Sequence, residues 1–222
     1  MIVLGGGLGA WIALFAAGVP AAASGPIGEP PPAQVTRLSL PFTGVWGVIQ
    51  GFDSGDTHTG YAAYALDFVP AQPRGARPPR RGAPLTRFVC YGRPVLAPAD
   101  GTVVVARGGA RDWPAYVKGK DEGNYVILEH APGEYTEFRH LAARSVTVHV
   151  GDRLHRGDLL GRCGNSGNAT TPHLHVGFLS SIDPITTRPM TLSGYETLGP
   201  DGGWRAGNGT PGQGEILRPF AH

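Results

Sequence analysis

The stretch that decides the fold is GNSGNATTPHLHVGF, residues 164–178. It begins with turn-forming glycine, asparagine and serine, and it ends in an apolar run that contains His173 and His175. In an extended strand, successive side chains point to opposite faces, so the two histidines share one face and Leu174 points to the other. Two neighbouring imidazoles can hold a zinc ion with one ring and serve its bound water with the other. The stretch therefore predicts a β-strand with a hydrolytic metal site on one face.

A candidate carboxylate ligand lies upstream. Asp67 belongs to YAAYALDFV, residues 61–69, where Tyr64, Leu66 and Phe68 alternate with smaller side chains. A strand here would bury this bulky set and put Asp67 on the opposite face. Because a carboxylate that faces inward without a partner is costly, we expect a cation beside it.

Two further histidines are available for the same site. His58 lies in a loop rich in Gly, Asp and Thr, residues 55–60, and His140 lies near the end of the alternating run 135–141. With His173, His175 and Asp67 they provide three ligands and two side chains for acid–base work. For each histidine the alternative is an ordinary loop or strand residue.

Taken together, these segments resemble the M23 peptidases, the LytM/lysostaphin-type zinc metallopeptidases that cut peptide cross-links of bacterial peptidoglycan. The resemblance covers about residues 51–178. Besides the stretch quoted first, it rests on the His58–Asp67 pair, PVLAPADGTVV (94–104), GNYVILEH (123–130), FRHL (138–141) and VGDRLHRGDLLG (150–161).

The resemblance implies one zinc ion per chain, with His58, Asp67 and His175 as ligands. The fourth position of such a tetrahedral site would hold water, as in catalytic rather than structural zinc sites. The resemblance also implies that His140 and His173 are the two catalytic histidines that do not bind the metal.

The chain departs from the family pattern at two places. Eight residues separate His58 from Asp67, where family members usually have three, although a related subset has a longer loop before the same aspartate. Phe138 stands where many members carry tyrosine. If that phenol donates to the oxyanion in those enzymes, another group must do so here.

Composition favours an all-β protein. The 222 residues are sized for one domain; glycine and proline make up about a quarter of them, and charged residues only 16%. We expect a compact antiparallel β-sandwich or barrel-like core with long loops, which is also the fold that the resemblance implies. The clearest predicted strands are 102–106, 125–129 and 145–150, and residues 38–52 are expected to enter as an edge strand.

The expected organisation has four parts. Residues 1–23 are apolar and end in small residues, which predicts a secretory signal peptide; a retained membrane anchor is the alternative. Residues 24–37 are a predicted Pro-rich linker, 38–180 the peptidase domain, and 181–222 a loop-rich C-terminal extension packed on the core. Within the domain, residues 70–84 carry Pro, Gly and Arg and predict an exposed loop.

The two cysteines and the net charge bear on the compartment. Cys90 and Cys163 suit an exported protein, and the sequence leaves open one disulfide or two buried thiols. The formal net charge of +2 favours adsorption to anionic wall polymers and is too small to indicate nucleic-acid binding.

The sequence thus predicts a monomeric zinc endopeptidase that acts on peptidoglycan peptides. We expect it to be secreted, periplasmic or associated with the cell wall, without nucleic-acid partners and without stable membrane insertion after signal cleavage. One alternative is a non-catalytic module of the same fold that binds wall peptides or regulates another wall hydrolase. Another is a peptidase directed at proteins or at a rival's wall. The bond cut, and which of His140 and His173 is the base, stay open.

Overall fold

The computed structural model describes residues 33–55 and 57–220. The predicted signal peptide and most of the predicted linker lie outside these residues. The elements are β1 (Trp46–Gln50), η1 (Gly60–Ala62), β2 (Leu66–Pro70), η2 (Leu85–Arg87), β3 (Pro94–Leu96), β4 (Gly101–Arg107), β5 (Asn124–Ala131), β6 (Glu134–Leu141), β7 (Arg153–Leu154), β8 (Leu159–Arg162), β9 (Leu174–Ile182), β10 (Ile185–Thr187), β11 (Leu192–Leu198), β12 (Trp204–Gly209) and β13 (Ile216–Pro219).

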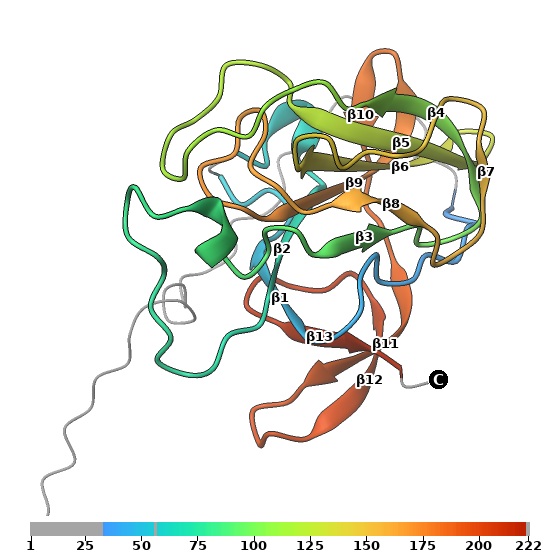
Figure 1. Cartoon of the computed structure of the whole chain (residues 1–222). Helices are drawn as coiled ribbons and strands as arrows, with labels where there is room; N and C mark the ends of the chain where they lie inside the picture. Colours follow the sequence, from blue (N-terminus) through green and yellow to red (C-terminus); the bar gives the residue numbers. More distant parts are fainter. Residues whose placement is uncertain (1–32, 56, 221–222) are drawn as a thin grey trace, which may run out of the picture.

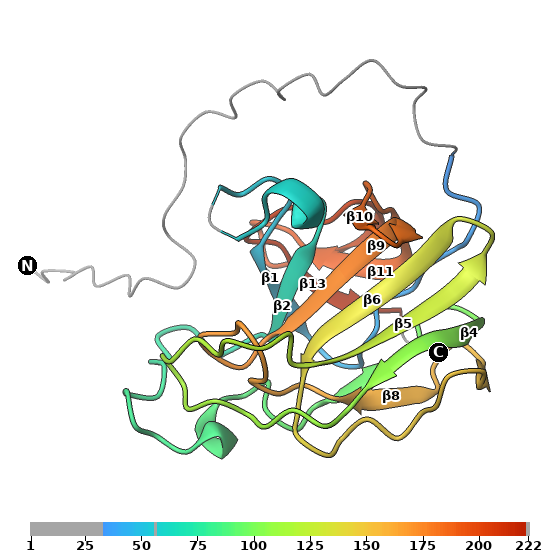
Figure 2. The ribbon, with the colours of Figure 1, turned by 90° about the horizontal axis from the view of Figure 1, so that it is seen from above.

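One large antiparallel sheet dominates the molecule, which confirms the all-β expectation. Its strands follow the order β12-β11-β13-β1-β2-β9-β6-β5-β4-β7, and β10 adds to β9 (Figure 1). The short strands β3 and β8 form a second, two-stranded sheet, which Figures 1 and 2 place to one side of the large one. The two helical elements are single 3₁₀ turns of three residues each.

The core lies on one face of the large sheet. Leu174, Val176 and Phe178 of β9 pack there with Leu66 and Phe68 of β2, and the core continues to the small sheet through Val95 and Leu160. Because side chains alternate along a strand, the residues between them face the other way. Asp67 and His175 therefore lie on the face opposite the core, as the alternating pattern predicts.

Strand β1 corrects the predicted edge strand. It lies inside the sheet, between β13 and β2, and Trp46 pairs with Leu217 on one side and Pro70 on the other. The sequence pattern could not reveal this position, because the strand that covers the expected free edge of β1 is β13, which lies about 170 residues later in the sequence.

Residues 181–222 hold more regular structure than the loops expected there. Strand β11 pairs with both β12 and β13, and β13 continues the sheet to β1. The guanidinium carbon of Arg218 in β13 lies over the ring of Trp204 in β12, 4.1 Å from the ring centroid. Of the glycine-rich sequences that predicted loops, residues 199–203 form the turn between β11 and β12, whereas residues 207–209 end β12 and only the residues after them lead into β13.

The predicted strand 145–150 is wrong. Its ends bend into turns, because the Ser145 N–H bonds to the Ala142 carbonyl and the His149 N–H bonds to the Asp152 carboxylate. Val146 and Val148 still pack inward, but Val150 is exposed. The alternating pattern thus correctly predicts that Val146 and Val148 face the core, but this segment does not pair with another strand.

Cys90 and Cys163 form a disulfide, which decides between the two alternatives left by the sequence. The bond joins the segment before β3 to the end of β8. Of the predicted loop 70–84, Pro70 ends β2, and residues 71–84 form no regular element and are largely exposed, as predicted. No helix in residues 33–55 and 57–220 is long and apolar enough to span a membrane.

Candidate metal centre

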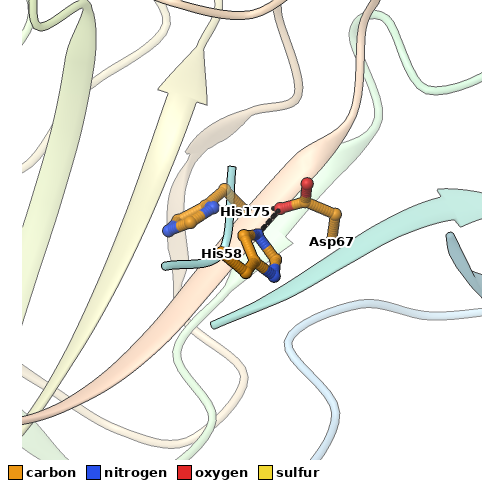
Figure 3. A group of neighbouring side chains, drawn as sticks. All are labelled: His58, Asp67 and His175. Carbon is orange, nitrogen blue, oxygen red and sulfur yellow. Dashed lines mark hydrogen bonds and ion pairs between the residues drawn. The ribbon is translucent and has the colours of Figure 1, made fainter. Parts of the chain in front are cut away.

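Strand pairing brings two of the predicted ligands together. Asp67 of β2 pairs directly with His175 of β9, so both side chains leave the sheet on the same face. The Nδ1 atom of His175 lies 2.9 Å from Oδ1 of Asp67. Figure 3 shows these side chains together with His58, the third predicted ligand.

His58 comes from the loop between β1 and η1 and is buried. Its Nδ1–H donates to the carbonyl oxygen of Gly51 at 2.9 Å. The proton on Nδ1 leaves Nε2 with a bare lone pair, and this atom lies 3.2 Å from Oδ1 of Asp67. Both atoms are then acceptors, so they cannot bond to each other.

The donor set fits a zinc ion. One ligand atom from each of His58, Asp67 and His175 lies within 4.8 Å of the others. Nε2 of His58 has no hydrogen-bond partner among the described residues although it is buried. Converging acceptors of two imidazoles and a carboxylate are costly without a cation, and they match the ligand types of catalytic zinc sites.

Charge in the metal-free site is shared between Asp67 and the histidines. Burial alone would raise the pKa of the Asp67 carboxyl, but the nearby His173 and the hydrogen bond from His175 hold it well below its usual range. Burial alone would lower the pKa of His175, but the carboxylates of Asp67 and Glu137 raise it to about 9. A proton thus occupies His175 at neutral pH when no metal is present.

The two predicted catalytic histidines stand beside the ligands. His140, near the end of β6, donates from Nδ1 to the Ser166 carbonyl at 2.9 Å, and His173, just before β9, donates from Nδ1 to the Thr171 carbonyl at 2.7 Å. Their ring centroids lie 4.8 Å apart. Each therefore has an Nε2 atom that can accept a proton; that of His173 lies 3.5 Å from Oδ2 of Asp67.

His140 is neutral in this environment. Burial lowers its pKa well below the usual histidine value, and electrostatic repulsion from the neighbouring His173 and His175 rings lowers it further. A neutral imidazole with a free Nε2 can act as a base. His140 also has a backbone φ of 62°, which is uncommon for a residue other than glycine.

A groove of about 670 Å³ lies over these side chains. All five predicted site residues line it. Its rim carries the charged residues Arg107, Lys118, Lys120, Asp121 and Glu122, of which Arg107 and Glu122 form an ion pair. The site can therefore admit an extended chain with polar or charged groups.

Sequence reasoning missed the network that supports His140. The Ser166 hydroxyl donates to the Leu141 carbonyl and accepts the Asn124 N–H, and the Asn124 amide reaches the same carbonyl. The Asp112 carboxylate accepts the Asn165 N–H and the Ala143 N–H. From the sequence, turn formation is the simplest role of Asn165 and Ser166 and contact with substrate is the alternative; neither predicts this support of His140, and no local pattern marks Asp112.

Two other positions on β6 differ from what their sequence context indicated. Phe138 is fully buried in the core, on the face away from the groove, so this side chain does not reach the metal centre. Glu137, which sequence reasoning passed over, is also fully buried and faces His175. The sequence signal that could have identified Glu137 is its position, as a charged residue, within the alternating run 135–141.

The other histidines in residues 33–55 and 57–220 lie away from the site. His130 bonds to the Asp100 carbonyl and to the Thr136 hydroxyl. His149 and His155 are exposed and lie near the carboxylates of Asp152 and Asp100, respectively. The structure thus gathers the four histidines that the sequence selected and leaves these three elsewhere.

Comparison with protein-family models gives a match to Peptidase family M23 over residues 85–186. The matched segment contains His140, His173 and His175 but begins after His58 and Asp67. The likeness of those two residues to known ligands therefore rests on their geometry and on the sequence resemblance.

Curated relatives cover a similar part of the chain. An uncharacterized metalloprotease of Haemophilus influenzae is 36% identical over 110 residues, which are 48% of this chain and 21% of that protein. The peptidoglycan DD-endopeptidase ShyA of Vibrio cholerae is 33% identical over 124 residues, which are 51% of this chain and 26% of that protein. The chain thus spans about a quarter of the length of these relatives.

Among solved structures, a zinc containing peptidase from Vibrio cholerae is 24% identical. The alignment covers 64% of this chain and 37% of that one, with a TM-score of 0.41.

Proposed function

We propose that this chain is a secreted, zinc-dependent endopeptidase that hydrolyses peptide cross-links or stem peptides of bacterial peptidoglycan. The match of residues 85–186 to the model of Peptidase family M23 supports this proposal. The observation that carries the proposal is the convergence of His58, Asp67 and His175 under a groove that also holds His140 and His173. The name of the relative ShyA, a peptidoglycan DD-endopeptidase, supports the substrate class.

In this proposal one zinc ion is held by Nε2 of His58, the carboxylate of Asp67 and Nδ1 of His175. When bound, zinc supplies Lewis-acid polarisation of the scissile carbonyl and of the attacking water. In the metal-free site protonated His175 donates from Nδ1 to Asp67, and the bare Nε2 of His58 lies beside the same carboxylate, so the three side chains are already together before a cation replaces the proton. Such preorganisation lowers the cost of assembling the site.

We assign the proton transfers from the surroundings of the two remaining histidines. His140 is neutral and presents a free Nε2 to the groove, so it accepts the proton of the attacking water. Nε2 of His173 lies 3.5 Å from Oδ2 of Asp67, at the edge of the proposed metal position. His173 then donates a proton to the leaving amine or hydrogen-bonds the developing oxyanion.

Three features support the substrate and the compartment. Lys118 and Lys120 line one side of the groove and suit the carboxylates of peptidoglycan stem peptides. The Cys90–Cys163 disulfide suits an oxidising compartment, and the apolar residues 1–23 suit export. We propose that the protein acts as a monomer, since the described residues contain all five groups of the site.

The second candidate is a non-catalytic module that binds wall peptides or regulates another hydrolase. It is distinguished by metal content, since degenerate members of such families lose ligands. Retention of three converging ligand atoms favours the enzyme.

The test is to incubate the purified protein with peptidoglycan, with and without a chelator, and to identify the released ends by mass spectrometry. New amine ends that vanish with chelator and return with zinc would establish the endopeptidase and identify the bond. A protein that binds zinc stoichiometrically but leaves peptidoglycan intact would refute the substrate, and a protein that binds no zinc would favour the binding module.

A further inference from the structure

Glu137 is a buried carboxylate with one oxygen unused. Its side chain is fully buried on β6, and Oε2 accepts a hydrogen bond from Nε of Arg139 at 2.7 Å. Its other oxygen, Oε1, has no hydrogen-bond partner among the residues that the structure describes. Leaving such an atom unpaired costs free energy, so its position calls for a partner.

The atom that Oε1 faces is Nε2 of His175. The two atoms lie 3.8 Å apart. A movement of about 1 Å would bring them to hydrogen-bond distance, and the terminal torsions of Glu and His are soft enough to allow it. His175 would then lie between two carboxylates, with Asp67 at Nδ1 and Glu137 at Nε2.

The sheet is built to admit this carboxylate. Glu137 pairs with Gly177 across β6 and β9, and Arg139 pairs with His175. A Cβ atom on Gly177 would lie 2.9 Å from Oε1 of Glu137 and 3.0 Å from its Cγ. Glycine at this position therefore leaves the space that the Glu137 side chain fills next to His175.

The tautomer that His175 needs for metal binding gives the Glu137 carboxylate a role as hydrogen-bond acceptor. Nδ1 of His175 is the nitrogen on the side of Asp67 and His58, so it must offer a lone pair to the metal. Nε2 then carries the hydrogen and needs an acceptor. Histidine ligands commonly donate this hydrogen to a carboxylate, which fixes the ring and raises its basicity.

We propose that Glu137 is a positioning residue for the metal centre, which accepts the Nε2–H of His175 and holds Nδ1 toward the metal. Nε of Arg139 donates to the other oxygen of this carboxylate, and the Arg139 guanidinium group lies over the Tyr125 ring, 4.7 Å from the ring centroid. The inference rests on the proposed zinc site, but it does not depend on the identity of the substrate.

The first test compares zinc affinity, measured by competition with a chromophoric chelator, in the full-length wild-type protein and two variants. Glu137→Gln keeps the shape but removes the anionic acceptor, and we expect zinc binding to weaken by about 10- to 100-fold. Glu134→Gln is the matched control. Glu134 is also a buried carboxylate of β6, but it accepts the N–H groups of Val35 and Thr36. We expect this control to lower thermal stability and leave zinc affinity unchanged.

Gly177→Ala tests the same contact without changing a charge. The added methyl group would displace the carboxylate, so zinc affinity should again fall. Because both variants act through one contact, the loss in the double variant should be smaller than the two single losses combined. Losses that simply add would contradict a shared mechanism.

The wild-type protein provides a test that needs no variant. In ¹⁵N–¹H correlation spectra of the zinc-loaded protein, His175 should carry its hydrogen on Nε2 and bind zinc through Nδ1. Zinc bound through Nε2 would overturn the proposal, as would unchanged zinc affinity in a folded Glu137→Gln variant. Absence of zinc binding by the wild type would refute the proposed metal site as well, so the two failures are distinguishable.

Discussion

The candidate site has two halves that are positioned in different ways. Asp67 and His175 are placed by strand register, because they pair directly across β2 and β9. His58, His140 and His173 are instead each anchored by a hydrogen bond from Nδ1 to a backbone carbonyl. We call these the register-placed pair and the carbonyl-anchored histidines.

The difference has a chemical consequence. A carbonyl can only accept, so each anchored ring must carry its hydrogen on Nδ1 and turn Nε2 to the site. The register-placed His175 is the exception, since its Nδ1 faces the metal position. Backbone ladders thus place the centre of the site, whereas single hydrogen bonds select the tautomer of the groups around it.

The largest effect is expected within the register-placed pair. His175→Ala removes a ligand whose place no neighbour can take, so zinc affinity should fall by more than about 100-fold and turnover should vanish. Metal content after dialysis and cleavage of peptidoglycan would measure the two effects. Stoichiometric zinc in this variant would show that the pair is not the centre of the site.

Among the carbonyl-anchored histidines, His140→Ala and His173→Ala should lower turnover by about 10²- to 10⁴-fold and leave zinc bound. The two are separated by a substrate with an ester in place of the scissile amide. An alcohol leaves with less need of a proton than an amine, so the ester should restore more activity to His173→Ala. Equal restoration in both variants would contradict proton donation by His173 to the leaving group and would leave it the oxyanion role.

The disulfide should matter to the anchored half more than to the pair. Replacing Cys90 and Cys163 by serine opens a link over a sequence separation of 73 residues, which should cost about 4 kcal/mol in the free energy of unfolding. Residues 164–168 follow Cys163 and contain the carbonyl that anchors His140. Urea titration should therefore show lower stability, and separate assays should show reduced turnover with unchanged zinc affinity. An equal loss of zinc affinity would contradict the separation of the site into the register-placed pair and the carbonyl-anchored histidines.

The pH dependence of metal-free stability tests the pair again. The pKa of His175 is about 9 in the folded protein and 6.5 without its partners. The folded state thus binds this proton more tightly, so the stabilisation is complete below pH 6.5 and is lost as pH rises to 9. With chelator present, the loss should be on the order of 3 kcal/mol. Denaturant titrations at both pH values measure it, and the drop should disappear in His175→Ala.

The smallest effect is expected for Ser166→Ala. The hydroxyl bridges the Leu141 carbonyl and the Asn124 N–H, so its loss should cost about 1–3 kcal/mol of stability. Since the carbonyl of the same residue anchors His140, turnover should fall severalfold while zinc affinity stays unchanged. A variant with wild-type turnover would show that the hydroxyl does not help to hold the anchor.

Local sequence patterns determined which face each site strand presents. Alternation in 61–69 and 173–178 predicted that Asp67, His173 and His175 point away from the core, because side chains in a strand repeat with a period of two. The resemblance to the M23 peptidases, which rests on the order of several motifs, then implied the fold and the division of the histidines into ligands and catalytic groups.

Only the tertiary structure decided which strands meet. Three features depend on contacts between residues far apart in the sequence. They are the pairing of Asp67 with His175, the pairing of β1 with β13 and the Cys90–Cys163 disulfide. Alternation of apolar and polar residues shows which side chains of a strand face the core, but it does not show which strand pairs with it or in which register. Residues 145–150 could therefore pack Val146 and Val148 against the core without pairing with another strand. For the same reason the sequence could not place Glu137 beside His175: that contact depends on the register of β6 against β9.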